Sequence, residues 1–285
     1  DQLHISYVHT PVRYAWDQMN IYLKRSFLRR IGLGPLIRWQ LYNLRQWDQL
    51  SSSRIDYLIA NSNFTAKRIW KYWKRSSEVL HPPVNVNRFD WKMPREDFYL
   101  SVCRLVPNKR VDLLVRAFNR LQLPLIIVGD GPEKEYLKKL AGPTVQVLGF
   151  QSPETIENLM SKCRAFVYAG IEDFGIAPVE AMASGAPVIA FGKGGVLDTV
   201  KCFSSDSGQG ATGLLFSAQS VKSLVDAIEF FKEKQLWKDL NPELIRNWAN
   251  SFSEDSFKFR FEKTIKKAWS DHLKSCDITT SDLRS

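Results

Sequence analysis

Two carboxylates, Glu172 and Glu180, stand on either side of a glycine, Gly175, in the stretch Glu-Asp-Phe-Gly-Ile-Ala-Pro-Val-Glu. A glycine at a helix start lets an anionic ligand approach the free backbone N–H groups, and the helix dipole favours negative charge there. A carboxylate accepts paired hydrogen bonds from neighbouring hydroxyl groups. Two carboxylates beside a phosphate site can therefore each hold one sugar of a diphosphate-linked pair, although two glutamates at this spacing also occur by chance.

Two cations, Arg104 and Lys109, follow the apolar run 98–102. Arginine neutralises a diphosphate through a bidentate fork and lysine as a point charge. A second feature, Gly129-Asp130-Gly131, follows the apolar run 125–128. A lone Gly-Asp-Gly sequence is most often only a turn, and two cations at a helix start are most often solvated. These residues indicate a ligand-binding site only if the fold brings them close together.

Short apolar runs alternate with helical segments through the second part of the chain, which predicts a parallel sheet covered on both faces, an α/β fold. The expected strands are 98–102, 125–128, 145–148, 165–168 and 187–191, and the expected helices are 110–121, 133–140, 174–184 and a capped helix from Ser152 to Cys163 with Pro153 at its first position. In the helix 110–121 the apolar face consists of Val111, Leu114, Val115 and Phe118. Such sheets bind ligands at the carboxyl ends of their strands, where the residues discussed above all lie.

A shorter series precedes it. The run His4–His9 and the run Asp56–Ala60 are expected strands, and a helix is expected over 64–73 with Ser62 or Asn63 as its N-cap. A Pro-rich linker begins at His81. The final helix is expected over 252–273.

The composition favours an anionic partner, since the formal net charge is +10 and the pI is about 9.4. A nucleoside diphosphate, a lipid surface or nucleic acid would suit this charge, as would a surface that is simply rich in lysine. The 4 cysteines are scattered without metal-ligand spacing, which indicates reduced thiols in a cytosolic protein. No run of eighteen apolar residues predicts a membrane span.

The string from Glu172 to Ala190 resembles the donor-site signature of the retaining glycosyltransferases of family 4, which have the GT-B architecture of two Rossmann-like domains. The resemblance covers nearly all of the chain and includes the segments Ser101–Arg110, Val128–Glu133, Val147–Phe150, Gly194–Val200, Thr212–Phe216 and Leu80–Asn85, with Arg88-Phe89 after the last. The opening segment His9–Trp16 is similar to the subset that uses GDP-mannose.

The resemblance implies roles by position. Glu180 would bind the ribose hydroxyls of the donor, and Glu172 would contact the transferred hexose. Arg104 and Lys109 would hold the diphosphate and stabilise the charge of the departing nucleotide. His9, at a strand end of the other domain, would face the donor sugar, although a loop histidine without a ligand also fits there.

Glycines and backbone groups complete the implied donor site. Backbone N–H groups near Phe174, Gly175 and Ile176 would help to hold the hexose, and residues around Gly149 and Phe150 would flank the base. The turn glycines Gly129 and Gly131 belong to the same implied set.

The implied reaction is transfer of a hexose from a nucleotide-diphosphate sugar to a glycan or lipid-linked acceptor with retention of configuration. It would not use the spaced carboxylate pair of a glycosidase. It would need no catalytic metal, because cations are present and no Asp-x-Asp motif follows a strand. No cofactor besides the donor is expected.

The expected organisation has four parts. Residues 1–85 are the last part of an acceptor domain whose beginning is missing, 86–250 are the donor domain, 251–275 form a helix that packs back on the first domain, and 276–285 are a disordered tail. A chain that lacks most of its acceptor domain is expected to depend on the missing part for turnover. The segment 201–210 has no assigned role.

The segment 22–47 mixes basic and aromatic residues, which fits two arrangements: an interfacial helix pair on anionic lipid, or an interdomain helix with a basic solvent face. Its residues of both kinds are Lys24, Arg25, Arg29, Arg30, Arg38 and Arg45 with Phe27, Leu28, Ile31, Trp39, Leu41 and Trp47. The first arrangement would place a cytoplasmic protein on the inner face of a membrane. Other functions that fit the sequence are a silent nucleotide-sugar-binding fragment, a GT-B epimerase or phosphorylase, and a basic nucleic-acid-binding protein. The sequence contains no convincing lysine site for pyridoxal phosphate, which argues against a phosphorylase. Its aromatic residues form no base-stacking platform, which argues against a nucleic-acid-binding protein.

Overall fold

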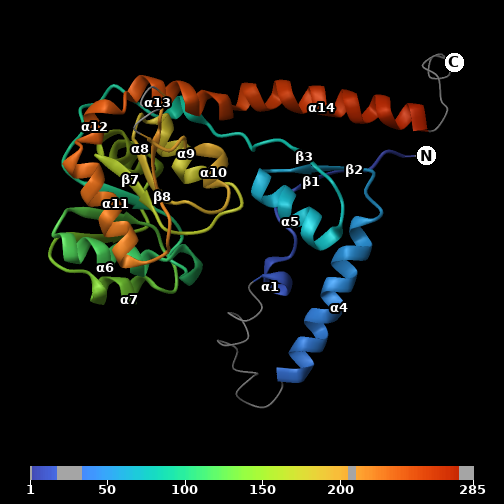
Figure 1. Cartoon of the computed structure of the whole chain (residues 1–285), viewed down its shortest axis with the longest axis horizontal. Helices are drawn as coiled ribbons and strands as arrows, with labels where there is room; N and C mark the ends of the chain where they lie inside the picture. Colours follow the sequence, from blue (N-terminus) through green and yellow to red (C-terminus); the bar gives the residue numbers. More distant parts are fainter. Residues whose placement is uncertain (1, 18–33, 205–209, 276–285) are drawn as a thin grey trace. The chain divides into compact units, whose positions relative to one another are not determined.

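A six-stranded parallel sheet and a three-stranded parallel sheet organise the described part of the chain (Figure 1). The computed structural model describes residues 2–17, 34–204 and 210–275. The chain divides into two compact units, the first formed by residues 1–81 with 258–285 and the second by residues 82–257. Each unit has its own parallel sheet, so the α/β fold predicted from the sequence is confirmed.

The sheet of the second unit has the strand order β6-β5-β4-β7-β8-β9, and all neighbouring strands are parallel. Its strands are β4 (Tyr99–Val102), β5 (Leu125–Val128), β6 (Val145–Gly149), β7 (Ala165–Tyr168), β8 (Val188–Phe191) and β9 (Gly213–Phe216). Every residue of β7 and of β8 is buried, as expected for central strands of a sheet covered on both faces.

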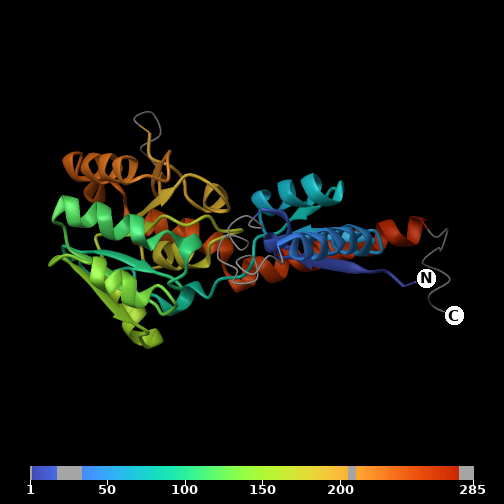
Figure 2. The same ribbon diagram turned by 90° about the horizontal axis from the view of Figure 1, so that it is seen from below.

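Helices connect these strands and cover the sheet. They are α6 (Val111–Leu121), α7 (Lys134–Leu140), α8 (Pro153–Lys162), α9 (Ile176–Ala183), α10 (Val196–Thr199), α11 (Val221–Glu233), α12 (Leu236–Asp239) and α13 (Pro242–Ala249), with the 3-10 turns η1 (Val86–Arg88), η2 (Pro107–Lys109) and η3 (Asn250–Phe252). Helix α6 packs against α11, and Figure 2 shows the two (green and orange) together on one side of the strands. Helix α13 packs against α9.

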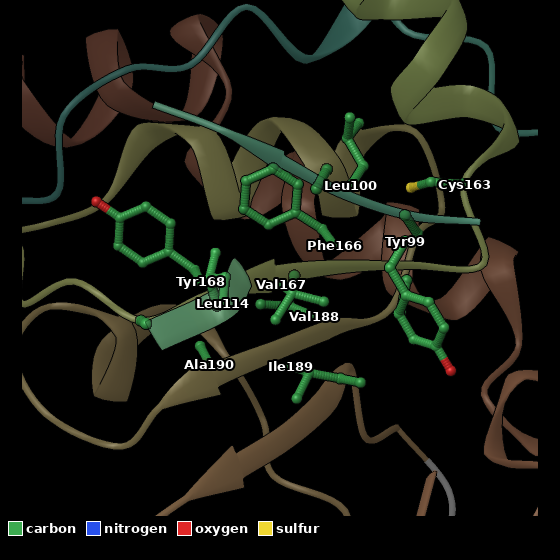
Figure 3. Packing of buried hydrophobic residues seen from close by; sticks show 14 of the residues in the cluster. Tyr99, Leu100, Leu114, Cys163, Phe166, Val167, Tyr168, Val188, Ile189 and Ala190 are labelled. Atoms are coloured by element: carbon green, nitrogen blue, oxygen red, sulfur yellow. The ribbon is translucent and has the colours of Figure 1, made fainter. Parts of the chain in front are cut away.

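The core of the second unit lies between the sheet and these helices. Figure 3 shows Phe166, Val167, Tyr168 and Val188 packed inside it. The rings of Phe166 and Tyr168 stack with their centroids 6.3 Å apart. The apolar face predicted for α6 is confirmed, because all four of its residues are at most 1% exposed. The strands and this helix therefore present a rigid edge to the loops that follow them.

Most of the expected helices differ from the observed ones by one residue at one end, and two helices start two residues later than expected. The helix predicted from Phe174 begins at Ile176, because Gly175 has φ +97° and this left-handed conformation cannot belong to a helix. The final helix, α14, spans Glu254–Ser275 rather than 252–273, because η3 precedes it and the Ser253 hydroxyl accepts the Ser256 N–H at 3.2 Å.

Strand β9 and helices α11 and α13 have no counterpart among the elements expected from the sequence. Their sequences do carry the usual signals at the helix starts. The Ser220 hydroxyl caps α11 by accepting the Ser223 N–H, and Asn241 caps α13 ahead of Pro242.

The first unit contains β1 (Ile5–Val8), β2 (Tyr57–Ala60) and β3 (Glu78–Val79) in the order β1-β2-β3, with helices α1 (Arg13–Trp16), α4 (Gly34–Ser52) and α5 (Asn63–Trp73) and the part of α14 from residue 258. The Ser62 hydroxyl accepts the Thr65 N–H at 3.0 Å, so the capped helix predicted after β2 is confirmed.

Glu78 joins α14 to this small sheet. Its carboxylate accepts hydrogen bonds from Tyr57 at 2.5 Å and from Thr264 at 2.7 Å, and it lies 3.0 Å from the Lys267 ammonium. The Tyr57 hydrogen bond contributes most to lowering the pKa of Glu78 to about 2, and Thr264 and Lys267 lower it further against the opposing effect of burial. The last helix is therefore attached to the strands by a charged, multiply bonded group.

Several expectations fall on residues that the structure leaves undescribed. The basic and aromatic residues between 22 and 31, residues 205–209 of the segment 201–210, and the tail 276–285 lie outside the described residues. Among the helices that are described, none has the length and apolar character needed to cross a membrane.

Candidate functional site

Loops from neighbouring strands meet at the carboxyl edge of the six-stranded sheet, because all its strands run in one direction. Lys109 follows β4 and Glu172 follows β7, and β4 and β7 are adjacent. The Lys109 ammonium forms an ion pair with Oε1 of Glu172. Two of the residues predicted to carry chemistry are thus in direct contact, although 63 positions separate them in the sequence (172 − 109).

A tyrosine completes this pair. The Tyr168 hydroxyl, at the end of β7, donates a hydrogen bond to the same Oε1 of Glu172. Gly170 makes room for the arrangement, because a Cβ at this position would lie 3.0 Å from the Tyr168 hydroxyl and 3.2 Å from the Lys109 Cα. Tyr168 was not among the residues predicted from the sequence, although its position at the last residue of a strand was an available signal. We call Lys109, Tyr168 and Glu172 the edge cluster.

A glycine pair packs against the loop that carries Glu172. The Gly195 N–H donates to the Glu172 carbonyl at 2.9 Å, and a Cβ at Gly195 would lie 2.4 Å from the Phe174 Cα. Gly194 has φ +93°, and a Cβ there would lie 2.5 Å from the Glu172 carbonyl oxygen. Both glycines are therefore explained by the close approach of two loops, which fixes the backbone around Glu172.

Helix α9 starts beside the edge cluster. Gly175 is its N-cap residue and has no side chain that could cap this end. Phe174 is buried and packs on Phe252 with ring centroids 5.7 Å apart, while the Ile176 side chain is half exposed. The helix start places backbone N–H groups and the positive end of the helix dipole next to Glu172.

Glu180 lies inside α9 and is largely buried, with a side-chain exposure of 22%. Arg88 Nη1 is 3.9 Å from its Oε1, and Arg88 Nε is 2.9 Å from Oε1 of Glu157 on α8. Burial raises the pKa of Glu180, the Arg88 charge lowers it, and the Glu157 charge raises it. A carboxylate whose pKa is raised by burial is found more often at functional sites than elsewhere.

The Gly129-Asp130-Gly131 turn supports the loop that carries Arg104. A Cβ at Gly129 would lie 1.8 Å from the Cys103 carbonyl oxygen, and one at Gly131 would lie 2.4 Å from that of Leu105. Both glycines are therefore required by backbone packing, and their role in ligand binding stays a prediction. Arg104 itself is exposed, and the described residues offer it no ion pair.

The loop after β6 also reaches this edge. Gly149 has φ +81°, and its carbonyl accepts the Gly129 N–H at 2.9 Å. The neighbouring Phe150 is 78% exposed, so its ring is available for stacking on a planar ligand. His9 belongs to the first unit, at the end of β1, and its ring contacts Tyr7 at 5.3 Å. It is not part of the edge cluster.

A cavity of about 590 Å³ lies elsewhere, in the first unit, near the amino ends of β2 and β3. Its lining includes Lys74, Arg75, Glu78 and Lys267. None of the predicted site residues borders it. Within the described ranges, no three His, Cys, Asp or Glu side chains gather in a way that could hold a metal ion.

The family model for glycosyl transferases group 1 matches residues 85–251. This stretch is more than half of the chain and contains every residue of the edge cluster. The chain belongs to the glycosyl transferases group 1 family. The recognition made from the donor-site signature is thereby confirmed.

Relatives of this group 1 chain carry mannosyltransferase names. It is 26% identical over 278 residues to the alpha-1,3/1,6-mannosyltransferase ALG2 of Candida glabrata, covering 75% of this chain and 59% of that protein. It is 31% identical over 246 residues to the GDP-mannose-dependent alpha-(1-6)-phosphatidylinositol monomannoside mannosyltransferase of Mycobacterium tuberculosis, covering 75% of this chain and 56% of that protein. The chain thus spans about three fifths of the length of these curated relatives.

Solved structures support the GT-B fold. Anabaena Alr3699/HepE, crystallised with UDP and glucose, superposes with a TM-score of 0.69 at 19% identity, covering 93% of this chain and 72% of that one. The galactosyltransferase WaaB of the lipopolysaccharide outer core superposes with a TM-score of 0.63 at 20% identity, covering 75% of this chain and 63% of that one. At these identities the likeness concerns the fold alone.

Proposed function

We propose that the second unit is the donor domain of a hexosyltransferase. The enzyme moves a hexose, for which mannose is the first candidate, from a nucleotide-diphosphate sugar to a glycan or lipid-linked acceptor. The observation that carries the proposal is the edge cluster. In this cluster a lysine and a carboxylate form an ion pair beside a helix start whose N-cap residue is a glycine. A site of this composition suits a ligand that combines a diphosphate with a sugar.

In this proposal each side chain has one task. Lys109 and Arg104 neutralise the diphosphate and the charge that grows on it as the glycosidic bond breaks. Glu172 accepts hydrogen bonds from the hexose hydroxyls, and Tyr168 and Lys109 hold it in position. Glu180 accepts hydrogen bonds from the ribose hydroxyls, and Phe150 stacks on the base. His9 is assigned a contact with the donor sugar.

Retention of configuration and independence from metal ions belong to the same proposal. The reacting face of the sugar is shared by the departing diphosphate and the incoming acceptor, so no second carboxylate is needed on the opposite face. Lys109 and Arg104 supply the positive charge that a metal would otherwise provide. Turnover in the presence of EDTA distinguishes a metal-independent from a metal-dependent mechanism. The proposal expects full turnover, and loss of turnover would contradict it.

The first unit is proposed as part of the acceptor domain, at 1–85, with the last helix at 251–275 packing back on it and 86–250 forming the donor domain. Helix α4 supports the proposal that this unit lies on an anionic membrane surface on the cytoplasmic side. It exposes Trp39 by 56%, Trp47 by 62% and Leu50 by 67%. Its acidic residue, Asp48, is buried and accepts hydrogen bonds from Trp16 and Trp73, so the exposed face carries no carboxylate.

A thermal-shift screen tests the donor assignment. The chain is melted with GDP-mannose, UDP-glucose, UDP-N-acetylglucosamine, the free nucleoside diphosphates and a short DNA duplex, each at 50 and 200 mM salt. We expect stabilisation by one nucleoside diphosphate and its sugar, with little dependence on salt. Binding of the duplex with a steep salt dependence and no response to any nucleotide would instead indicate a nucleic-acid-binding protein.

A further inference from the structure

Arg88 lies between two carboxylates of the second unit. It ends the 3-10 turn η1, with Nε 2.9 Å from Oε1 of Glu157 and Nη1 3.9 Å from Oε1 of Glu180. Its guanidinium also stands over the ring of Phe89 at 4.9 Å, and that ring is buried. The Arg88 guanidinium is thus held by Glu157 and packs on Phe89, and its Nη1 atom faces Glu180.

A second arginine holds the turn that carries Arg88. Arg246 on α13 donates from Nη1 to the carbonyls of Val86 and Ala183, the latter at 2.8 Å, and from Nη2 to Asn87 Oδ1 at 3.2 Å. Val86 and Asn87 belong to η1, and Ala183 is the last residue of α9. One side chain therefore ties the turn of Arg88 to the helix of Glu180, so the fold itself sets their separation.

The charge of Glu180 depends on this arrangement. The side chain is largely buried, which raises its pKa, and the Arg88 charge lowers the pKa while the Glu157 charge raises it. An ionised carboxylate accepts hydrogen bonds from two neighbouring hydroxyls with both oxygens, whereas a protonated carboxyl group uses one oxygen as a donor and loses part of its acceptor capacity. A cation beside Glu180 therefore favours binding of a vicinal diol there.

Resting on the proposed donor site, we propose that Arg88 is a positioning residue for the nucleotide ribose: it keeps the Glu180 carboxylate charged and oriented to accept both hydroxyls of the 2′,3′-diol. Arg88 acts through Glu180 and does not itself touch the reacting atoms. The linker turn after the first unit is then part of the donor site.

The test compares nucleotides with and without the diol. Isothermal titration calorimetry measures the affinity of the wild type and of Arg88→Met for GDP and for 2′,3′-dideoxy-GDP. If the wild type prefers UDP, UDP and 2′,3′-dideoxy-UDP are used instead. We expect the wild type to favour the nucleotide with the diol. Arg88→Met should bind it about tenfold more weakly and the dideoxy nucleotide less than about twofold more weakly, since the variant weakens the charge-assisted hydrogen bonds between Glu180 and the ribose hydroxyls.

Two variants serve as controls. Arg116→Met makes the same substitution on α6, at an exposed arginine that donates to the Tyr136 hydroxyl, and should bind both nucleotides like the wild type. Arg88→Lys keeps the charge but loses the fork, and should recover part of the preference for the diol. Binding of the dideoxy nucleotide also reports that Arg88→Met is folded.

Each other outcome is decisive. If Arg88→Met keeps the wild-type preference, or weakens both nucleotides by the same factor, Arg88 does not act on the diol and the inference is wrong. A wild type without preference for the diol removes the role of Glu180 while the donor site stands. A wild type that binds no nucleoside diphosphate overturns the proposed function itself, and the inference with it.

Discussion

Lys109 and Glu172 form an ion pair across the carboxyl ends of β4 and β7, and Tyr168 donates a hydrogen bond to the same carboxylate oxygen. The side chains of Lys109 and Glu172 are only 18% and 21% exposed, so the pair is partly shielded from solvent. Partly buried pairs are screened by salt less than surface pairs. The group proposed to hold phosphate and the group proposed to hold the hexose are therefore coupled before any ligand arrives.

The first prediction concerns this coupling. Glu172→Gln should reduce transfer by about tenfold to a hundredfold, because hydrogen bonds to a charged group contribute about 1.5–3 kcal/mol. Lys109→Met should reduce it by about a hundredfold or more, as loss of an oxyanion-stabilising donor does. The double variant should lose less than the product of the two factors, since the residues act as one unit. Steady-state transfer rates for the four proteins measure this.

Lys138→Met is the matched control for the lysine change, because Lys138 lies on α7 in an exposed pair with Glu135 at 3.6 Å. It should leave transfer unchanged. Strictly multiplicative effects of Lys109→Met and Glu172→Gln would show that the two residues act independently.

The second prediction concerns Glu180. Burial raises its folded-state pKa, so the folded protein binds this proton more tightly than the unfolded chain does, and stability falls as pH rises through the raised pKa. Ionised Glu180 therefore costs stability at neutral pH. Glu180→Gln should raise Tm by about 2–4 °C, the change that about 1 kcal/mol makes in a domain of this size.

The same substitution should weaken nucleotide binding, and wild-type affinity should fall as pH is lowered through the raised pKa of Glu180, because the charged form accepts the ribose hydroxyls. Arg88 and Glu157 are the charged groups that face it. Melting curves and titrations between pH 4.5 and 8 provide both readouts. A Glu180→Gln variant with lower Tm and unchanged nucleotide affinity would assign this residue a purely structural role.

The third prediction separates two glycines of one loop. Gly195→Ala should destabilise the second unit by about 1–3 kcal/mol, because its Cβ would meet the Phe174 backbone at 2.4 Å and neither backbone can move freely. Gly192→Ala is the matched control, with its nearest atom at 3.4 Å. Urea denaturation measures both, and equal stabilities would contradict the close packing of the two loops.

The fourth prediction concerns the attachment of α14. Glu78→Gln should loosen the contact of Thr264 and Lys267 with the small sheet and speed hydrogen exchange in the last turns of α14. Because the pKa of Glu78 is lowered to about 2, its contribution is present above the ordinary carboxyl range and is lost as pH falls toward about 2. Lys266→Met, which removes an exposed partner of Glu262, is the control. Unchanged exchange in Glu78→Gln would show that other contacts hold the helix.

Much of the fold follows from local sequence. The strands of the second sheet are short apolar runs bounded by turns, and the apolar stripe of α6 is visible in its spacing. The start of α9 was displaced by two residues because the conformation of Gly175 depends on the loop it closes, which no periodicity records.

The site residues that directly follow strands could be predicted from the sequence. Contacts made by residues that are distant in the sequence could not. Lys109 and Glu172 were expected together because the carboxyl ends of parallel strands meet. Tyr168 was missed because a tyrosine at a strand end resembles a core residue, and its ring is indeed buried in the core (Figure 3). The contact of Arg88 with Glu180 joins positions 92 residues apart (180 − 88) through a turn and a helix, and no local pattern predicts it.

Hydrogen–deuterium exchange of the chain with and without GDP-mannose or UDP-glucose tests the central claim most directly. The account predicts protection in three loops of the second unit, 103–110, 169–176 and 192–196, and in the first turns of α9. Protection confined to the cavity near β2 and β3, or no protection with any nucleotide sugar at millimolar concentration, would contradict a donor site at the carboxyl edge of the six-stranded sheet.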